Sequence, residues 1–163
     1  MTGADRPTLP SRLIQATFVQ KTKTELAVRT GGAQWVFIGN FIAELAAVAR
    51  TDPYIRGEIA AVLDAAAEDP SRLRSRDVTY PMKVAAAERG VDIGELYVGE
   101  RPEGHRIYFA EPTAETLVLA LKYALKEGSD WKILQNSQIL EAADVYLAWL
   151  RSMGWRPAQT ATP

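Results

Sequence analysis

The sequence predicts a single α+β domain in which a helical hairpin and a C-terminal helix pack on a small antiparallel sheet. Three observations favour this class. A length of 163 residues suits one domain. Apolar residues recur at helical spacing in the first half of the chain, and from residue 93 they alternate at strand spacing. We expect residues 12–155 to form the domain, and the proline-containing segments 1–11 and 156–163 to be flexible.

The first half predicts a strand followed by helices. Apolar side chains alternate over residues 12–20, which is typical of a half-buried strand, and a short helix over about 22–29 follows. A helical stripe then runs from Trp35 to Val48, and a second runs over 55–66. Pro53 stops one helix and suits the first turn of the next, so the two helices should form a hairpin.

The second half predicts a short helix, three strands and a long helix. The alanine-rich segment 82–89 should be helical and should end at Gly90. Strands joined by tight turns are expected at about 93–99, 105–111 and 117–125. One apolar face up to Gly154 predicts the last helix, with Asn136 or Ser137 placed to cap its start.

Composition excludes much catalytic chemistry. The chain has no cysteine and one histidine, so a thiol nucleophile, a thiolate zinc site and a two-histidine metal site are all excluded. No metal or cofactor is expected. No segment reads as a secretory signal or a membrane helix, which predicts a cytoplasmic protein without a membrane partner. A net charge of −1 gives no global attraction for nucleic acid.

The amino-acid pattern of residues 94–150 points to a particular class of function. Leu96-Tyr97 leads into GHRIYF at 104–109, and an apolar strand then ends at Lys126 before a helix that contains alanines. This pattern resembles the RelE/ParE superfamily of bacterial toxins, especially its phage-related HigB-type branch. The resemblance implies a RelE/ParE-like fold. It also implies the toxin of a type II toxin–antitoxin pair, acting as a metal-independent mRNA endonuclease with an antitoxin, mRNA and the ribosome as partners.

The same resemblance assigns candidate catalytic residues. Arg106 and Lys126 would carry charge against the phosphate, Tyr108 would position or stack a base, and His105 would transfer a proton. Neighbouring strand residues point to opposite faces, so His105 and Arg106 should not share a pocket unless the turn reorients one of them. Glu95 and Tyr108 are alternatives for the proton transfer.

Further cations are candidates for nucleic-acid contact. The segment SRLRSRD carries alternating arginines that would present three guanidiniums on one side if the segment were extended. A solvated loop is the alternative. The complete candidate set is Arg72, Arg74, Arg76, Lys83, Lys122 and Lys132.

A second function stays open. At the strand that carries lysines in RelE-type nucleases this chain has Glu95, Tyr97 and Glu100, and residues 71–163 hold 12 basic and 12 acidic residues. These departures favour a binding module without enzymatic activity that inhibits or regulates a host protein. For the toxin function, a stripe on the helical hairpin would receive the antitoxin, either as a helix in a groove or as an added strand.

Overall fold

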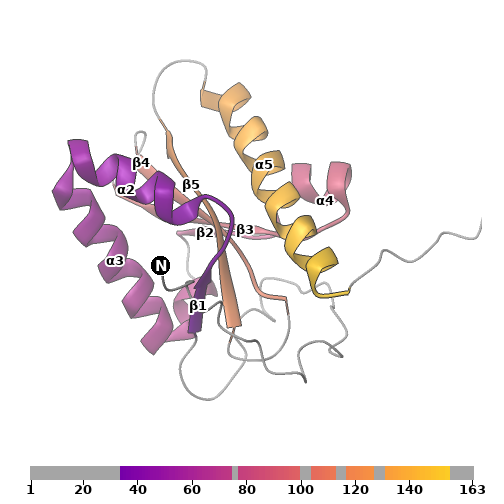
Figure 1. Cartoon of the computed structure of the whole chain (residues 1–163), viewed down its shortest axis with the longest axis horizontal. Helices are drawn as coiled ribbons and strands as arrows, with labels where there is room; N and C mark the ends of the chain where they lie inside the picture. The colour runs from indigo at the N-terminus through magenta and orange to yellow at the C-terminus, as the bar shows by residue number, and fades with distance from the viewer. Residues whose placement is uncertain (1–33, 75–76, 100–103, 113–116, 127–130, 155–163) are drawn as a thin grey trace, which may run out of the picture.

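A five-stranded mixed sheet lies between two layers of helices in this α+β protein (Figure 1). The computed structural model describes residues 34–74, 77–99, 104–112, 117–126 and 131–154. In chain order the elements are β1 (Gln34–Phe37), α2 (Phe41–Thr51), α3 (Pro53–Glu68), the 3₁₀ helix η2 (Pro70–Arg74), β2 (Val78–Thr79), α4 (Lys83–Arg89), β3 (Gly94–Val98), β4 (Gly104–Ala110), β5 (Leu117–Lys126) and α5 (Trp131–Ser152). The strand expected at 12–20 and the helix expected at 22–29 lie outside the described residues.

The strands are ordered β1-β5-β4-β3-β2 across the sheet. The expected meander of β3, β4 and β5 is confirmed, since both of its pairings are antiparallel. The expectation of a wholly antiparallel sheet is wrong, because β1 runs parallel to β5 and pairs with it from Leu117 to Ala120. The helices α2, α3, η2 and α4 and the strands β2, β3 and β4 separate β1 from β5 in the chain, and such a long connection permits parallel pairing.

β1 replaces the first part of a predicted helix. Trp35 lies in the strand, and α2 begins only at Phe41. Gly39 separates the two elements with φ of +59°, a backbone conformation that glycine adopts without strain. The aromatic and β-branched residues before Gly39 suit a strand, and the Trp35 indole donates a hydrogen bond to the Leu63 carbonyl at 2.9 Å.

The hairpin of α2 and α3 is confirmed. Asp52 accepts a hydrogen bond from the Ile55 amide and so caps α3, while Pro53 occupies its first turn. The hairpin covers one face of the sheet, where buried side chains of both helices pack on Ile107 and Phe109. Its core contribution comes mainly from Phe41, Ile55, Ile59, Leu63 and Ala66.

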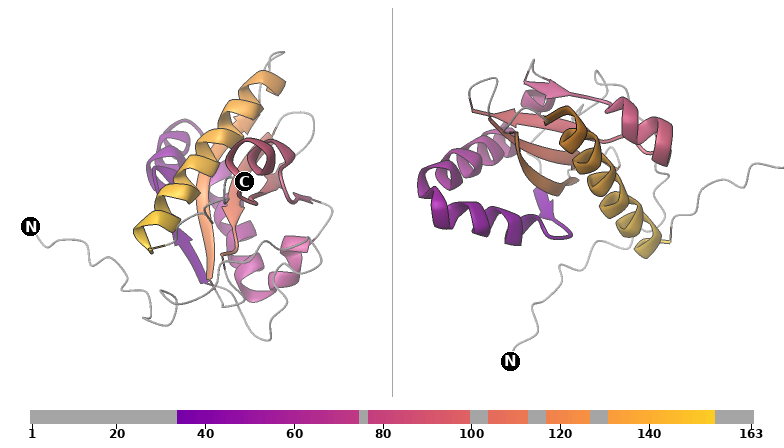
Figure 2. Two further views of the ribbon diagram at one scale, coloured as in Figure 1. Left: turned by 90° about the vertical axis from the view of Figure 1, so that its right-hand side faces the viewer. Right: turned by 90° about the horizontal axis from the view of Figure 1, so that it is seen from above.

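The other face of the sheet is covered by α4 and α5 (Figure 2). The helices therefore form two layers, with the hairpin on one face of the sheet and α4 and α5 on the other. Both faces of β4 and β5 are apolar over most of their length, so each face needs a cover. The short helix α4 ends as predicted at Gly90, which has φ of +68°.

α5 begins earlier than predicted. It starts at Trp131, so Asn136 and Ser137 lie within it, and neither caps it. Its buried residues begin only at Ile139, and the turns before that carry no fully buried side chain. Those turns extend past the sheet in Figure 1 and Figure 2. The polar sequence there reflects exposure rather than a helix boundary.

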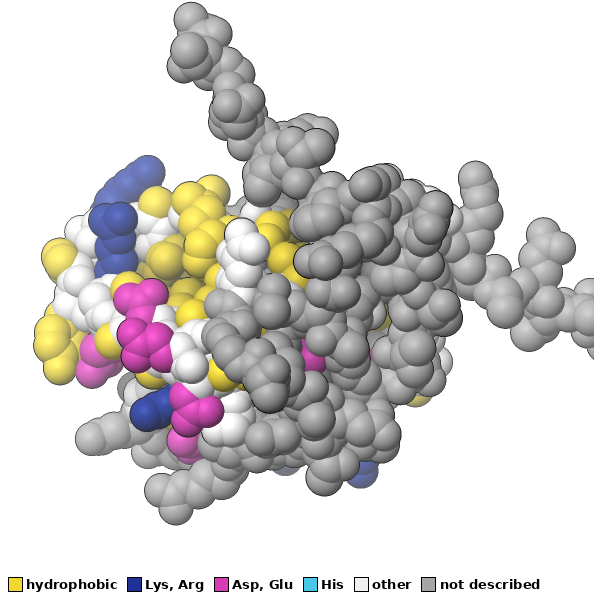
Figure 3. Space-filling model, turned by 90° about the horizontal axis from the view of Figure 1, so that it is seen from below, with side chains coloured by type: hydrophobic (Ala, Val, Ile, Leu, Met, Phe, Trp, Pro, Cys, Tyr) yellow, Lys and Arg dark blue, Asp and Glu magenta, His cyan; other side chains and the backbone are white. Residues whose placement is uncertain are grey.

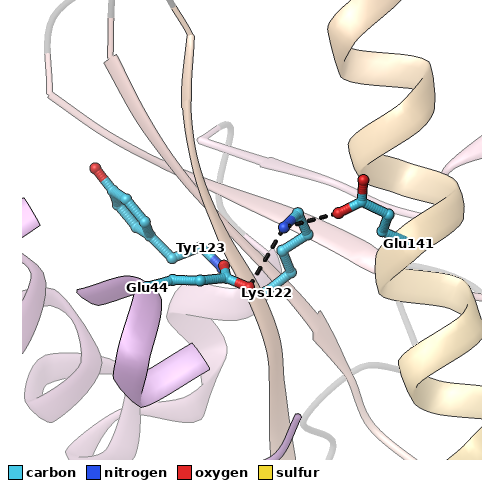
Figure 4. Close-up of polar contacts among 4 residues, drawn as sticks. All are labelled: Glu44, Lys122, Tyr123 and Glu141. Carbon is cyan, nitrogen blue, oxygen red and sulfur yellow. Dashed lines mark hydrogen bonds and ion pairs between the residues drawn. The ribbon is translucent and has the colours of Figure 1, made fainter. Parts of the chain in front are cut away.

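A bulge in β5 directs a lysine toward both helical layers. Tyr108 pairs with Lys122 but the next residue, Phe109, pairs with Ala120, which leaves Leu121 as the extra residue. Lys122 Nζ lies 3.3 Å from Glu44 Oε1 on α2 and 2.9 Å from Glu141 Oε2 on α5 (Figure 4).

Glu44 also closes an open sheet edge. β1 ends opposite Ala120, so within the described part of the chain the later residues of β5 have no strand on that side. The second oxygen of Glu44 accepts the Tyr123 amide at 2.9 Å (Figure 4). Burial disfavours the charged form of Lys122, but Glu141 and Glu44 together outweigh it and raise the pKa of Lys122. These contacts tie α2, β5 and α5 together.

We expect Glu44→Ala to lower the free energy of unfolding by about 1–2 kcal/mol, because the Tyr123 amide then lacks an acceptor. Glu141→Ala is the matched control on the same lysine. Its side chain is 60% exposed, so we expect a loss of about 0.5 kcal/mol or less. Denaturant unfolding measures both, and equal losses would contradict the role given to Glu44.

Candidate functional site

The polar residues of the candidate site lie on the sheet face that α5 covers. Glu95 on β3 pairs across the strands with Tyr108 on β4, which pairs in turn with Lys122 on β5. Arg106 lies two residues before Tyr108 and shares its face. Charged and hydroxyl groups thus form a contiguous polar area on an otherwise apolar surface.

Arg106 and Glu95 form a buried ion pair. Arg106 Nε lies 3.4 Å from Glu95 Oε1, and the two residues are only 4% and 7% exposed. Gln135 of α5 donates a hydrogen bond to the second Glu95 oxygen at 2.8 Å. Arg106 is therefore not an exposed phosphate ligand in this conformation, because its charge is offset within the protein.

Three cations surround the indole of Trp131, the first residue of α5. Lys126 Nζ lies 3.6 Å from the ring centroid, Lys132 Nζ lies 5.5 Å away, and the Arg106 guanidinium carbon lies 5.8 Å away. All three distances are within the range of cation–π attraction. We call Trp131, Arg106, Lys126 and Lys132 the Trp131 cluster. It places Lys132, a candidate for nucleic-acid contact, beside Arg106 and Lys126, the candidates for phosphate charge.

Tyr108 is fully buried beside this cluster. Its hydroxyl has no hydrogen-bond partner among the described residues, and the same holds for Arg106 Nε. Burial raises the pKa of Tyr108, Glu95 raises it further, and Arg106 opposes the change. Tyr108 is thus a neutral group at physiological pH, and in this conformation it is not accessible for stacking a base.

His105 lies on the opposite face of the sheet from Arg106. Its Nδ1 forms a hydrogen bond with the hydroxyl of Tyr123, and the two rings stack with centroids 5.8 Å apart. The turn therefore does not reorient His105, as the alternation of strand residues implies. The structure gathers Arg106, Tyr108 and Lys126 on one face but leaves His105 out of that group.

The environment of His105 predicts a pH dependence of stability. Burial lowers the pKa of His105 below its usual 6.5, against the opposing influence of Asp52 and Glu58. The unfolded chain then binds a proton more readily than the folded chain does. The free energy of unfolding should be at its full value above about pH 6.5 and should fall as the pH drops below it.

The measurement compares wild type and His105→Gln between pH 7.5 and 5.5. Wild type should lose stability over this interval and the variant should lose less. Because the chain has a single histidine, its NMR titration reports this pKa directly. A pKa at or above 6.5 would contradict the assigned environment.

The other predicted nucleic-acid contacts do not join the Trp131 cluster. Arg72 and Arg74 lie in η2, a 3₁₀ helix, so the extended backbone on which the one-sided arrangement depended is not present there. Arg76 lies outside the described residues. Arg72 and Asp77 both line a groove of about 340 Å³, so the groove carries charges of both signs. Lys83 is exposed on α4, and Lys122 is held by Glu44 and Glu141.

Surface charge is mixed elsewhere too. On the lower face of the molecule, basic and acidic side chains of the described residues lie side by side among apolar ones (Figure 3). Within the described ranges, no three His, Cys, Asp or Glu side chains group as metal ligands. No helix in the same ranges combines the length and apolarity needed to cross a membrane.

Sequence reasoning missed two members of the site. Trp131 and Gln135 fall in a stretch that predicted a break before the last helix. Their signal is weak, because an exposed helical turn carries polar residues as a loop does. Comparison with protein-family models, curated proteins and solved structures finds no match to this chain.

Proposed function

We propose that this protein is the toxin of a bacterial or phage toxin–antitoxin pair, similar to RelE/ParE toxins, and that it cleaves mRNA without a metal ion. The order of elements supports the proposal. A strand, a helical hairpin, a three-stranded meander and a C-terminal helix occur in this order, which is also the order in the toxins that the sequence resembles, although η2, β2 and α4 lie between the hairpin and the meander here. The observation that favours RNA as the substrate is the Trp131 cluster, because it combines cations with an aromatic ring.

The chemistry follows from the groups at this site. The ribose 2′-oxygen attacks the adjacent phosphorus, the bond to the 5′-oxygen breaks, and a 2′,3′-cyclic phosphate forms. Glu95 accepts the proton of the 2′-hydroxyl, and Lys126 offsets the phosphate charge and protonates the leaving 5′-oxygen. Arg106 positions Glu95 through their ion pair.

Access to Glu95 requires movement of α5. Gln135 lies on one oxygen of Glu95, and the Trp131 ring lies beside its partner Arg106. RNA therefore reaches the carboxylate only when the first turns of α5 shift from the sheet. These turns bury no side chain completely, so their displacement exposes little apolar surface.

Induced expression tests this proposal. Wild type should arrest bacterial growth, and Lys126→Ala should relieve the arrest, because the variant lacks the group that offsets the phosphate charge and protonates the leaving oxygen. Lys126 is partly exposed, so its loss leaves the core intact. Lys83→Ala is the matched control on α4 and should leave the arrest unchanged. A chain that folds and accumulates without affecting growth would overturn the proposal.

A second function, capture of a host protein without RNA cleavage, is favoured by the burial of Arg106 and by an exposed groove. The groove holds about 280 Å³ on the outer side of the hairpin, and its lining residues are Ile42, Leu45, Ala46, Ala49, Arg50 and Arg56. Ile42 is 56% exposed, which is high for an isoleucine. An apolar helix that carries carboxylates fits this lining, since both arginines flank the apolar floor.

The two functions differ in which variants restore growth. If the protein acts by capturing a host protein, Ile42→Asp should relieve the arrest and Lys126→Ala should not. If it acts on RNA, Lys126→Ala should relieve the arrest. Under the RNA function Ile42→Asp should instead weaken neutralisation by an antitoxin, because the groove is then the antitoxin's site.

A further inference from the structure

Trp131 is large, partly exposed and placed where the sheet no longer supports α5. The buried residues of α5 begin eight positions later, at Ile139. The ring is therefore not a core residue, although tryptophan in a helix usually is. What surrounds it is charge, since Lys126, Lys132 and Arg106 all lie within 5.8 Å of its centroid.

The cations around the ring differ in their carboxylate partners among the described residues. Glu95 pairs with Arg106, but no carboxylate of the described residues forms an ion pair with Lys132. Arg106 is also 4% exposed with its Nε lacking a hydrogen-bond partner, and the neighbouring Tyr108 hydroxyl lacks one too. A buried donor without a partner is costly. The site thus suits a ligand that brings negative charge and a planar ring together.

We infer that the Trp131 ring is the stacking platform for one base of single-stranded RNA, with Lys126 and Lys132 binding the adjacent phosphates. This inference rests on the proposed RNA function and deepens it. Binding draws Lys126 toward a phosphate, and the base takes the place of its ammonium group over the indole. A duplex hides its base faces, so the ligand is single-stranded. The family resemblance assigned the stacking of a base to Tyr108, whereas this inference assigns it to Trp131.

The test is the binding of a fluorescein-labelled 2′-O-methyl oligoribonucleotide of eight residues, which cannot be cleaved, measured by anisotropy with the full chain. Trp131→Leu should raise the Kd by about 5- to 150-fold, the cost of losing one base–aromatic stack. Trp131→Phe should retain most of the affinity. Trp149→Phe is the matched control, because Trp149 lies near the other end of α5, where it stacks on Tyr146.

Two further measurements test the inference independently: the salt dependence of binding, and the affinity for duplex RNA compared with single-stranded RNA. Lys132→Ala should weaken binding and reduce the slope of log K against log salt by about 0.7, one phosphate contact on a single strand. A duplex of the same sequence should bind weakly. Lys132 is exposed, so this variant keeps the test decisive even if Trp131→Leu unfolds.

Three results would overturn the inference. They are equal affinity of wild type and a folded Trp131→Leu, equal affinity for the duplex and the single strand, and no binding by wild type. If RNA is nevertheless cut in cells, the proposed function stands and only the platform is wrong. If the oligonucleotide binds as expected but RNA is never cut, the platform stands and the nuclease proposal fails.

Discussion

Replacing Glu95 with alanine should lower the free energy of unfolding by about 3–5 kcal/mol, because it leaves Arg106 buried without its counter-charge. The expected loss is large because Arg106 is 4% exposed and sits beneath α5. Denaturant unfolding with circular dichroism detection measures it.

The control for this prediction removes both charges. Glu95→Ala combined with Arg106→Leu should recover more than half of the loss, since an apolar pair of similar volume avoids the cost of burying charge. Glu95→Gln keeps an acceptor for Gln135 and should lie between wild type and alanine. If Glu95→Ala stays within about 1 kcal/mol of wild type, the ion pair is not a buried structural element.

If the protein cleaves RNA as we propose, reversing two charges of the Trp131 cluster should nearly abolish the cleavage. In Lys126→Glu combined with Lys132→Glu, carboxylates would face the phosphates, and we expect the cleavage rate to fall by at least about 100-fold, the typical cost of one lost charge-stabilising group. Cleavage of a labelled mRNA fragment by the purified chain, or in a translation extract, measures the rate. Thermal unfolding should change little, because Lys132 is exposed and Lys126 is partly exposed.

Lys83→Glu is the matched control for this double variant. Lys83 is exposed on α4 and lies outside the Trp131 cluster, so its reversal should leave the rate within about twofold, an energy change of a few tenths of a kcal/mol. A similar loss in Lys83→Glu would mean that RNA is bound by general surface charge and not by the cluster.

The parts of the fold that sequence predicted well are those with one dominant periodicity. β3 alternates, β4 and β5 are apolar over most of their length, and α3 repeats apolar residues between a proline and an Asp-Pro pair. Each signal is local, so neighbouring residues suffice to read it. The end of α4 at Gly90 was also predictable from local sequence, because the residue that ends the helix there has a left-handed conformation, which glycine adopts readily.

The errors arise where tertiary contacts decide. Trp35 fits a helical stripe with Phe41, but pairing with β5 makes it part of a strand, and only the partner strand distinguishes the two. The start of α5 looked like a loop because its turns project from the sheet and are polar. The layer arrangement depends on which face each helix covers, which no local pattern contains.

For the candidate site too, local sequence signals were predictive and tertiary contacts were not. Strand alternation predicted that His105 and Arg106 point to opposite faces. The contact between Glu44 and Lys122 could not be predicted, because the residues lie 78 positions apart and the bulge at Leu121 sets the direction of the lysine. The role of Trp131 could not be predicted from local sequence, because it depends on cations of β4 and β5 that lie beside the ring only in the folded protein.

The central claim is that the protein cuts mRNA through the Trp131 cluster, and mapping RNA 5′ ends in cells shortly after induction tests it most directly. We predict new ends within coding regions in wild type, and their absence in Lys126→Glu combined with Lys132→Glu at equal protein level. Growth arrest by wild type without any new RNA ends would contradict the claim and would favour capture of a host protein.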